Sequence, residues 1–174
     1  MISEKNQGKR EEDSGQGAGV RGQGAEQSKI PKPNTQNPTS SIEAVSILVG
    51  GEAEGEILRL EPPVSFWGGV DPKTGELTNP NHPKYGTSIA GKIVVMTRGI
   101  GSSSGSSILL ELLAIGKGPA GILMEEADAI LSLGAVVARE MGYGEMPVWI
   151  IKSEDIIELP SHAKLFANGG LEKL

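Results

Sequence analysis

The sequence predicts a mixed α/β domain in which crossover helices pack against a mixed sheet. Between residues 92 and 151, strand-like apolar segments alternate with helix-like segments, a pattern typical of parallel strands joined by helices. The segments on either side of this region resemble strands joined by turns, which indicates antiparallel pairing at the ends of the sheet. A chain of 174 residues is long enough for one such domain.

The first 41 residues differ from the rest of the chain. They are rich in Gly, Gln, Ser, Asn and Pro and contain no aromatic residue. Such a segment cannot bury enough apolar surface to offset its ordering entropy, so we expect a disordered polar tail at 1–41 and a folded domain at 42–174. The tail has no apolar signal-peptide core, and the acidic residues 11–13 argue against a mitochondrial presequence. We therefore expect a cytoplasmic protein.

The first half of the domain contains two expected strands, a long loop, a third strand and a helix. The two strands cover residues 43–51 and 55–61 and are separated by a glycine-containing turn. Residues 62–91 carry Pro, Gly and Asn at close intervals, which predicts an ordered loop. Residues 92–97 form a short apolar run typical of a buried strand, and residues 102–116 place leucine and isoleucine at helical spacing.

The second half continues the alternation and ends in a hairpin. We expect a strand at residues 120–125, a helix at 128–141 and a strand at 147–151. Residues 162–174 predict a closing hairpin that turns at Asn168–Gly169.

Composition excludes several classes of function. The net charge of −6 argues against a nucleic-acid surface, and no apolar run approaches the ~18–20 residues that a membrane helix needs. The chain has no cysteine, so it can supply no thiol nucleophile and no thiolate ligand for zinc or an iron–sulfur cluster. With only two histidines, we expect no metal site built from this chain alone.

The segment "RGIGSSSGSS", residues 98–107 and hereafter the serine loop, holds five serines and three glycines where a strand leads into a helix. A helix N-terminus of this composition can present backbone N–H groups and hydroxyls to an anion. One interpretation is a dinucleotide fingerprint of Gly99, Gly101 and Gly105, with Glu125 or Glu126 as the ribose-binding acid, although its spacing is one residue too long.

A second interpretation is a serine hydrolase. Residues 101–105 match G-x-S-x-G, with Ser103 as nucleophile, Asp128 or Asp155 as the acid and His162 as the base. A third, non-enzymatic interpretation is an interaction module.

Four motifs occur in an order that points to one family: "SFWGGVDPKTGE" (65–76), "NHPKYGTSIAGKIVV" (81–95), "RGIGSSSGS" (98–106) and "ILSLGAVVAREM" (130–141). Together they resemble the small swivelling domain of the aconitase X family over roughly residues 43–170. The resemblance implies a layered β/β/α fold like the last domain of aconitase. It also implies that the chain is the small subunit of a two-subunit hydro-lyase whose large subunit binds the iron–sulfur cluster, and that it is inactive when isolated. The substrate is then a hydroxy acid, with cis-3-hydroxy-L-proline favoured and phosphomevalonate as the alternative.

The resemblance also implies roles for individual residues. Ser102 corresponds to the serine base that removes a proton from carbon, helped by the helix N-terminus and by a nearby cation. The expected substrate-binding residues are Arg98, Gly101, Ser103, Ser106, Asp71 and His82.

Overall fold

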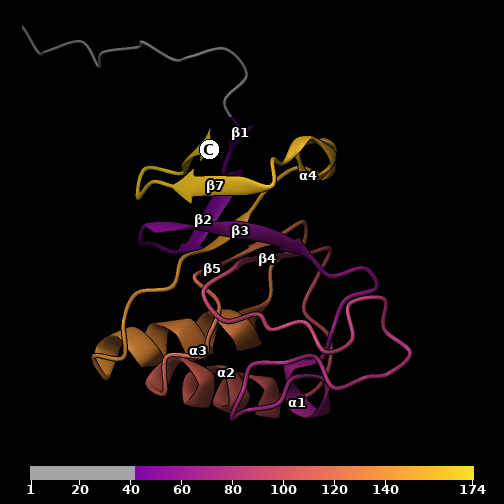
Figure 1. The fold of residues 1–174 in the computed structure, drawn as a ribbon. Helices are drawn as coiled ribbons and strands as arrows, with labels where there is room; N and C mark the ends of the chain where they lie inside the picture. Colours follow the sequence, from indigo (N-terminus) through magenta and orange to yellow (C-terminus); the bar gives the residue numbers. More distant parts are fainter. Residues whose placement is uncertain (1–41) are drawn as a thin grey trace, which may run out of the picture. The chain divides into compact units, whose positions relative to one another are not determined.

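The computed structural model describes residues 42–174 (Figure 1). The tail expected at residues 1–41 lies outside the described residues, and its disorder stays a prediction. The described residues contain eight strands and four helical segments, which follow in chain order: β1 (Ile42–Glu43), β2 (Ser46–Val49), β3 (Ala53–Arg59), α1 (Phe66–Gly69), β4 (Ile93–Met96), α2 (Ser104–Ala114), β5 (Gly121–Met124), α3 (Ala129–Glu140), β6 (Val148–Ile150), α4 (Ser153–Glu158), β7 (His162–Leu165) and β8 (Gly170–Lys173).

The strands form one mixed sheet in the order β1-β8-β7-β3-β4-β5-β6-β2. Its centre, β3-β4-β5-β6, is parallel, and its remaining pairs are antiparallel. This confirms the predicted mixed sheet with crossover helices in the middle and antiparallel ends. The closing hairpin is also confirmed, since Gly169 N–H donates to the carbonyl of Phe166 within its turn (2.9 Å).

The sheet is curled because its two outermost strands are neighbours in the chain. Only Ala44 and Val45 separate β1 from β2, yet these strands stand at opposite ends of the strand order. Ala44 N–H donates to Gly169 next to β8, and Val45 N–H donates to Ile150 of β6 (2.8 and 2.7 Å). The strand expected at residues 43–51 is therefore broken in two, and β2 does not pair with β3 across the glycine turn.

Alternating side chains of the central strands fill two separate cores. On β4, Val94 and Met96 face a core shared with the helices, whereas Ile93 and Val95 face a core inside the curl of the sheet. Buried Trp149 of β6 belongs to the inner core. Both faces of these strands are buried, as parallel strands require, and the result is the expected β/β/α layering.

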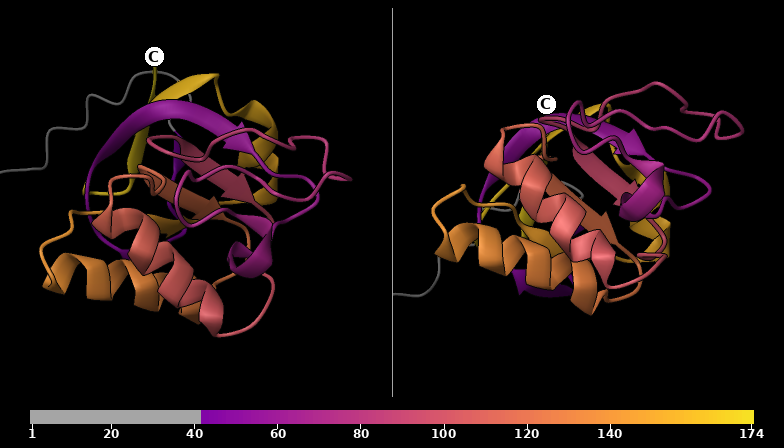
Figure 2. Two further views of the ribbon diagram at one scale, coloured as in Figure 1. Left: turned by 60° about the horizontal axis from the view of Figure 1, so that its bottom comes forward. Right: turned by 90° about the horizontal axis from the view of Figure 1, so that it is seen from below.

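The helices divide between the two sides of the sheet. Helices α2 and α3 lie side by side along one face, with α1 beside the start of α2, while α4 lies on the opposite side (Figures 1 and 2). The segment α1 is one irregular turn with non-helical backbone angles at Trp67 and Gly68. Neither α1 nor α4 was expected from the sequence. Among residues 42–174, no helix is long and apolar enough to cross a membrane.

Candidate functional site at the serine loop

The serine loop lies at the edge where the parallel strands end. It leaves β4 after Met96 and enters α2 at Ser104, so it stands beside the loop that joins β5 to α3. In open α/β sheets, ligands bind at the carboxyl ends of the strands, where such loops meet. The loop is therefore in the position of a ligand site.

Ser102 presents its side chain to solvent at the N-terminal end of α2. The N–H of Gly105 donates to the Ser102 carbonyl (2.9 Å), and Ser103 is the N-cap residue without a side-chain capping bond. No described group forms a hydrogen bond with the Ser102 hydroxyl. The first N–H groups of a helix have no intrahelical acceptor, and those of Ser103 and Ser104 form no backbone hydrogen bond with any described residue.

Two neighbouring elements hold the loop in place, and glycines allow their close approach. A Cβ atom on Gly101 would collide with the side chain of Ser65, and a Cβ atom on Gly99 would collide with the carboxylate of Asp128. Ser65 also pairs with Ile100 in a parallel β-bridge. The glycines that resembled a dinucleotide fingerprint therefore serve close packing against protein groups at these two positions.

Arg98 is an exposed cation at the start of the loop. None of the carboxylates in the described residues forms an ion pair with it. An exposed guanidinium can bind an anion through two parallel hydrogen bonds. Unlike the guanidinium of Arg98, the hydroxyl of Ser106 has a partner among the described residues, because it donates to the carbonyl of Ser103 (2.7 Å).

Asp71 and His82 have local structural partners. The carboxylate of Asp71 accepts hydrogen bonds from the N–H groups of Lys73 and Thr74 (2.7 and 3.3 Å), which fixes its own turn. His82 is 5% exposed. Its Nδ1 accepts from the N–H of Lys84 (3.0 Å) and its Nε2 bonds to the carbonyl of Pro62 (2.9 Å), so no ring nitrogen is left for a ligand. These two residues therefore hold their loop together.

The hydrolase interpretation finds no triad among the described residues. Asp128 is the N-cap of α3 and accepts from the N–H of Leu131 (2.7 Å). Ser103, Asp155 and His162 form no side-chain hydrogen bonds with one another. The predicted nucleophile thus has no base positioned to activate it.

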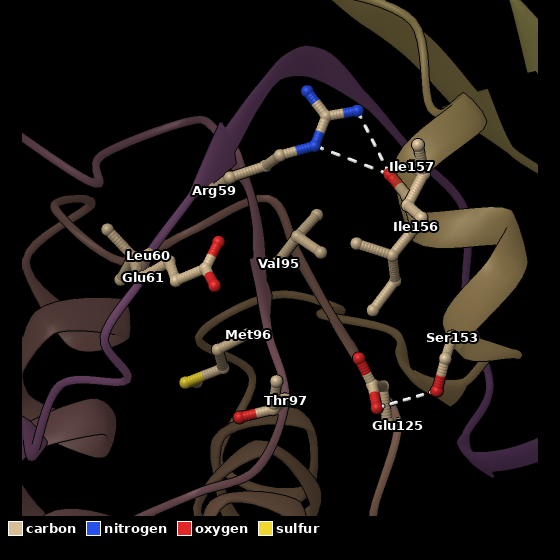
Figure 3. A pocket seen from close by; sticks show the side chains of 10 residues that line it. All are labelled: Arg59, Leu60, Glu61, Val95, Met96, Thr97, Glu125, Ser153, Ile156 and Ile157. Carbon is tan, nitrogen blue, oxygen red and sulfur yellow. Dashed lines mark hydrogen bonds between the residues drawn. The ribbon is translucent and has the colours of Figure 1, made fainter.

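A pocket of about 250 Å³ lies between the start of the serine loop and α4 (Figure 3). Arg59 donates to the carbonyls of Ile156 and Leu159 at the end of α4 (2.7–3.3 Å), and the Ser153 hydroxyl donates to Glu125 (2.7 Å). These contacts hold α4 against the end of β3 and the segment that follows β5. Thr97, which precedes Arg98, also lines the pocket. Local sequence patterns could not reveal this pocket, because the partners of Arg59 lie 97 and 100 residues away in the chain.

The Glu56 carboxyl has a lowered pKa, and it lies away from the serine loop. Lys92 forms an ion pair with Glu56 (2.6 Å), and its hydrogen bond and charge lower the pKa of the Glu56 carboxyl. Lys92 precedes β4, so the pair lies near the amino end of that strand, whereas the serine loop follows its carboxyl end.

The residues that the structure describes do not fit an iron–sulfur cluster. The sequence contains no cysteine. Within residues 42–174, no group of three or more His, Asp or Glu side chains is arranged to hold a metal ion.

Comparison with known proteins identifies one family. Residues 42–169 match the family model of the aconitase X swivel domain. The solved structure of Thermococcus kodakaraensis aconitase X in its holo-form superposes with a TM-score of 0.67 at 34% identity, covering 78% of this chain and 99% of that one.

Curated relatives carry two different names. Cis-3-hydroxy-L-proline dehydratase of Pseudomonas aeruginosa is 46% identical over 101 residues, which are 58% of this chain and 17% of that protein. The enzyme of the same name from Hypocrea jecorina is 38% identical over 133 residues, 76% of this chain and 22% of that protein. The phosphomevalonate dehydratase small subunit of Pyrococcus furiosus is 39% identical over 122 residues, 70% of this chain and 85% of that protein. The chain thus spans less than a quarter of the two cis-3-hydroxy-L-proline dehydratases and most of the small subunit.

Proposed function

This chain belongs to the aconitase X swivel domain family, and from that membership and the serine loop we propose that it is the small subunit of a hydro-lyase that dehydrates a hydroxy acid. The observation that carries the proposal is the position of Ser102. Its hydroxyl is exposed at the start of α2, at the carboxyl edge of the sheet, with no competing partner among the described groups.

Ser102 is the base in this proposal. Its oxygen, as the alkoxide, takes a proton from the carbon next to the one that bears the hydroxyl, and the released electron pair forms the carbon–carbon double bond as hydroxide leaves. The departing hydroxide and the Ser102 proton together make the water that is lost, which restores the alkoxide. Serine is a poor base in water, so the negative charge needs the N–H groups at the start of α2 and a nearby cation.

Arg98 is the residue we assign to the substrate carboxylate. Its guanidinium is exposed, and a guanidinium binds a carboxylate through two parallel hydrogen bonds. Gly101 and Ser103 would contact the substrate through the backbone and Ser106 would support them, whereas Asp71 and His82 shape the neighbouring loop.

The remaining component of the reaction is assigned to the partner. A large aconitase X-type subunit would supply the iron–sulfur cluster, which assists departure of the hydroxyl as a Lewis acid. The absence of cysteine from this chain supports that division of labour. The isolated chain is then inactive.

Two substrates are candidates. The favoured one is cis-3-hydroxy-L-proline, because Arg98 is the only basic residue between Thr97 and Lys117 and a substrate with both a phosphate and a carboxylate needs more positive charge. Phosphomevalonate is the second candidate. It is favoured by the match to a separate small subunit over 85% of that subunit's length.

The test is dehydration by a reconstituted complex. The chain is co-expressed with the large aconitase X-type subunit of the same organism, and both substrates are assayed. We expect turnover of cis-3-hydroxy-L-proline by the complex and none by either subunit alone. Turnover of phosphomevalonate alone would make phosphomevalonate the substrate. Turnover of neither substrate would contradict the dehydratase and favour the non-enzymatic interaction module. Labelling of Ser103 by a fluorophosphonate probe would instead revive the hydrolase.

A further inference from the structure

Two large apolar side chains are exposed at the serine loop, Ile100 within it and Trp67 in the segment beside it. Trp67 is 61% exposed and Ile100 is 43% exposed. The β-bridge between Ser65 and Ile100 brings their segments together, and Gly101 packs against the Ser65 side chain between them. Trp67 and Ile100, hereafter the anchor pair, therefore lie beside the proposed base.

The backbone around Trp67 is held by a buried neighbour and by hydrogen bonds to its carbonyl groups. Its neighbour Phe66 is buried in the helix-side core. The Ser65 hydroxyl donates to the Trp67 carbonyl (3.0 Å), and Thr78 binds the carbonyl of Gly68 through its hydroxyl (2.8 Å). These contacts order the backbone at Trp67, which reduces the entropy lost when the tryptophan is covered, and tryptophan is enriched among the residues that dominate binding energy at interfaces.

The relatives indicate that a domain of this kind works with a larger protein part. The same domain makes up 17% and 22% of the two cis-3-hydroxy-L-proline dehydratases but 85% of a protein named as a small subunit. In the first two, most of the protein lies in the same polypeptide as this domain. A domain that occurs both within a larger chain and as a separate subunit needs a surface on which the larger part docks.

We propose that the anchor pair docks this chain onto the large subunit, with the Trp67 indole inserted into an apolar pocket of that partner. This rests on the proposed function, since it takes the partner to be the cluster-bearing chain. The small residues Gly101 and Ser102 between the anchors let the partner's backbone approach closely. Docking at this position covers Ser102 and excludes water, which strengthens the electrostatic support of its alkoxide.

The opposite edge of the domain provides a matched control. Met141 is 54% exposed at the C-cap of α3. Because α3 starts after the carboxyl end of β5 and runs back along the sheet, Met141 at its C-cap lies at the edge away from the serine loop. Truncation of Met141 removes an exposed apolar side chain without touching the anchor pair.

The experiment uses calorimetry to measure how tightly the large subunit, purified without this chain, binds variants of the full chain. We expect Trp67→Ala to weaken binding by about 30-fold or more, Trp67→Phe to weaken it less, and Met141→Ala to change it by no more than about twofold. Ser102→Ala should bind like the wild type, which separates docking from catalysis. Thermal unfolding of each variant alone checks that the fold is retained.

Fluorine NMR gives a second readout that does not depend on truncation. With 5-fluorotryptophan in this chain only, exposed Trp67 and buried Trp149 give separate signals. Addition of the large subunit should abolish the solvent isotope shift of the Trp67 signal and leave that of Trp149 unchanged. Equal binding by Trp67→Ala and wild type, or a persistent Trp67 solvent shift in an active complex, would overturn the docking inference and leave the proposed function standing. A tight complex with a covered Trp67 but no dehydration would support the docking surface and overturn the function.

Discussion

The carbonyl oxygen of Ser106 lies against Gly134, so closely that a Cβ atom added to Gly134 would stand 2.9 Å from it. Ser106 belongs to the first turn of α2 and Gly134 to the middle of α3. The contact sets how closely α3 packs against the first turn of α2. The geometry around Ser102 thus depends on a glycine 32 residues further along the chain.

Replacement of Gly134 by alanine tests this contact. Alanine favours a helix over glycine by about 1 kcal/mol, but the rigid backbone of Ser106 leaves no room for the methyl group, and overpacking costs about 1–3 kcal/mol. We expect a net loss in the free energy of unfolding, measured by urea denaturation. Gly105→Ala is the matched control, because its nearest neighbours would lie 3.8 Å from the new Cβ. A Gly134→Ala variant as stable as the control would show that the contact relaxes freely.

Replacement of Asp128 tests its role as a helix cap. Asp128→Ala removes the acceptor for the Leu131 N–H and should lower the free energy of unfolding by about 1 kcal/mol. Asp128→Asn keeps an acceptor oxygen and should lose less. Equal losses in the two variants would mean that the charge matters and the hydrogen bond does not.

Arg98→Gln tests the carboxylate site in the reconstituted complex. Loss of a charge-assisted hydrogen-bond pair worth about 1.5–3 kcal/mol should raise KM by roughly 10- to 100-fold. Stability should not change, because no described carboxylate pairs with Arg98. Arg139→Gln, on the last turn of α3, is the control. An unchanged KM in steady-state kinetics would remove Arg98 from the substrate site.

The ion pair of Glu56 with Lys92 predicts a pH dependence of stability. The folded state lowers the pKa of Glu56 below its ordinary value of 4.5, so the pair stabilises the fold above that pH and its contribution disappears as the pH falls further. Glu56→Gln should therefore be less stable than wild type at pH 7 and approach it in acid. In a Lys92→Met background most of this pH-dependent effect should be lost, because the charges of His162 and Lys84 contribute less to the lowered pKa of Glu56 than Lys92 does. An undiminished pH dependence in that background would contradict the assignment.

Local sequence patterns predicted the parallel centre of the fold because its signals are local. The apolar runs of β4 and β5 and the helical spacing in α2 each lie within one segment. The partner of β2 could not be predicted, because it pairs with β6 about a hundred residues later. Helix α4 escaped prediction because six residues carry little periodicity and its C-terminal carbonyls are held by Arg59.

In the candidate site, too, only the features with a local sequence signal could be predicted. The exposure of Ser102 and Arg98 follows from a polar segment between a buried strand and a helix. The structural partners of Asp71 and His82 could not be predicted, because backbone groups in loops satisfy them and leave no periodic signal. Nor did composition reveal that Gly99 and Gly101 pack against Asp128 and Ser65.

The most direct test of the central claim is the turnover of the complex after removal of one hydroxyl. Ser102→Ala and Ser107→Ala each delete a single oxygen from an exposed serine, at the start of α2 and within it. If Ser102 is the base, its alanine variant should lose about 10²- to 10⁴-fold in kcat with a nearly unchanged KM, while Ser107→Ala changes kcat by no more than about twofold. Equal turnover by the two variants would contradict the account.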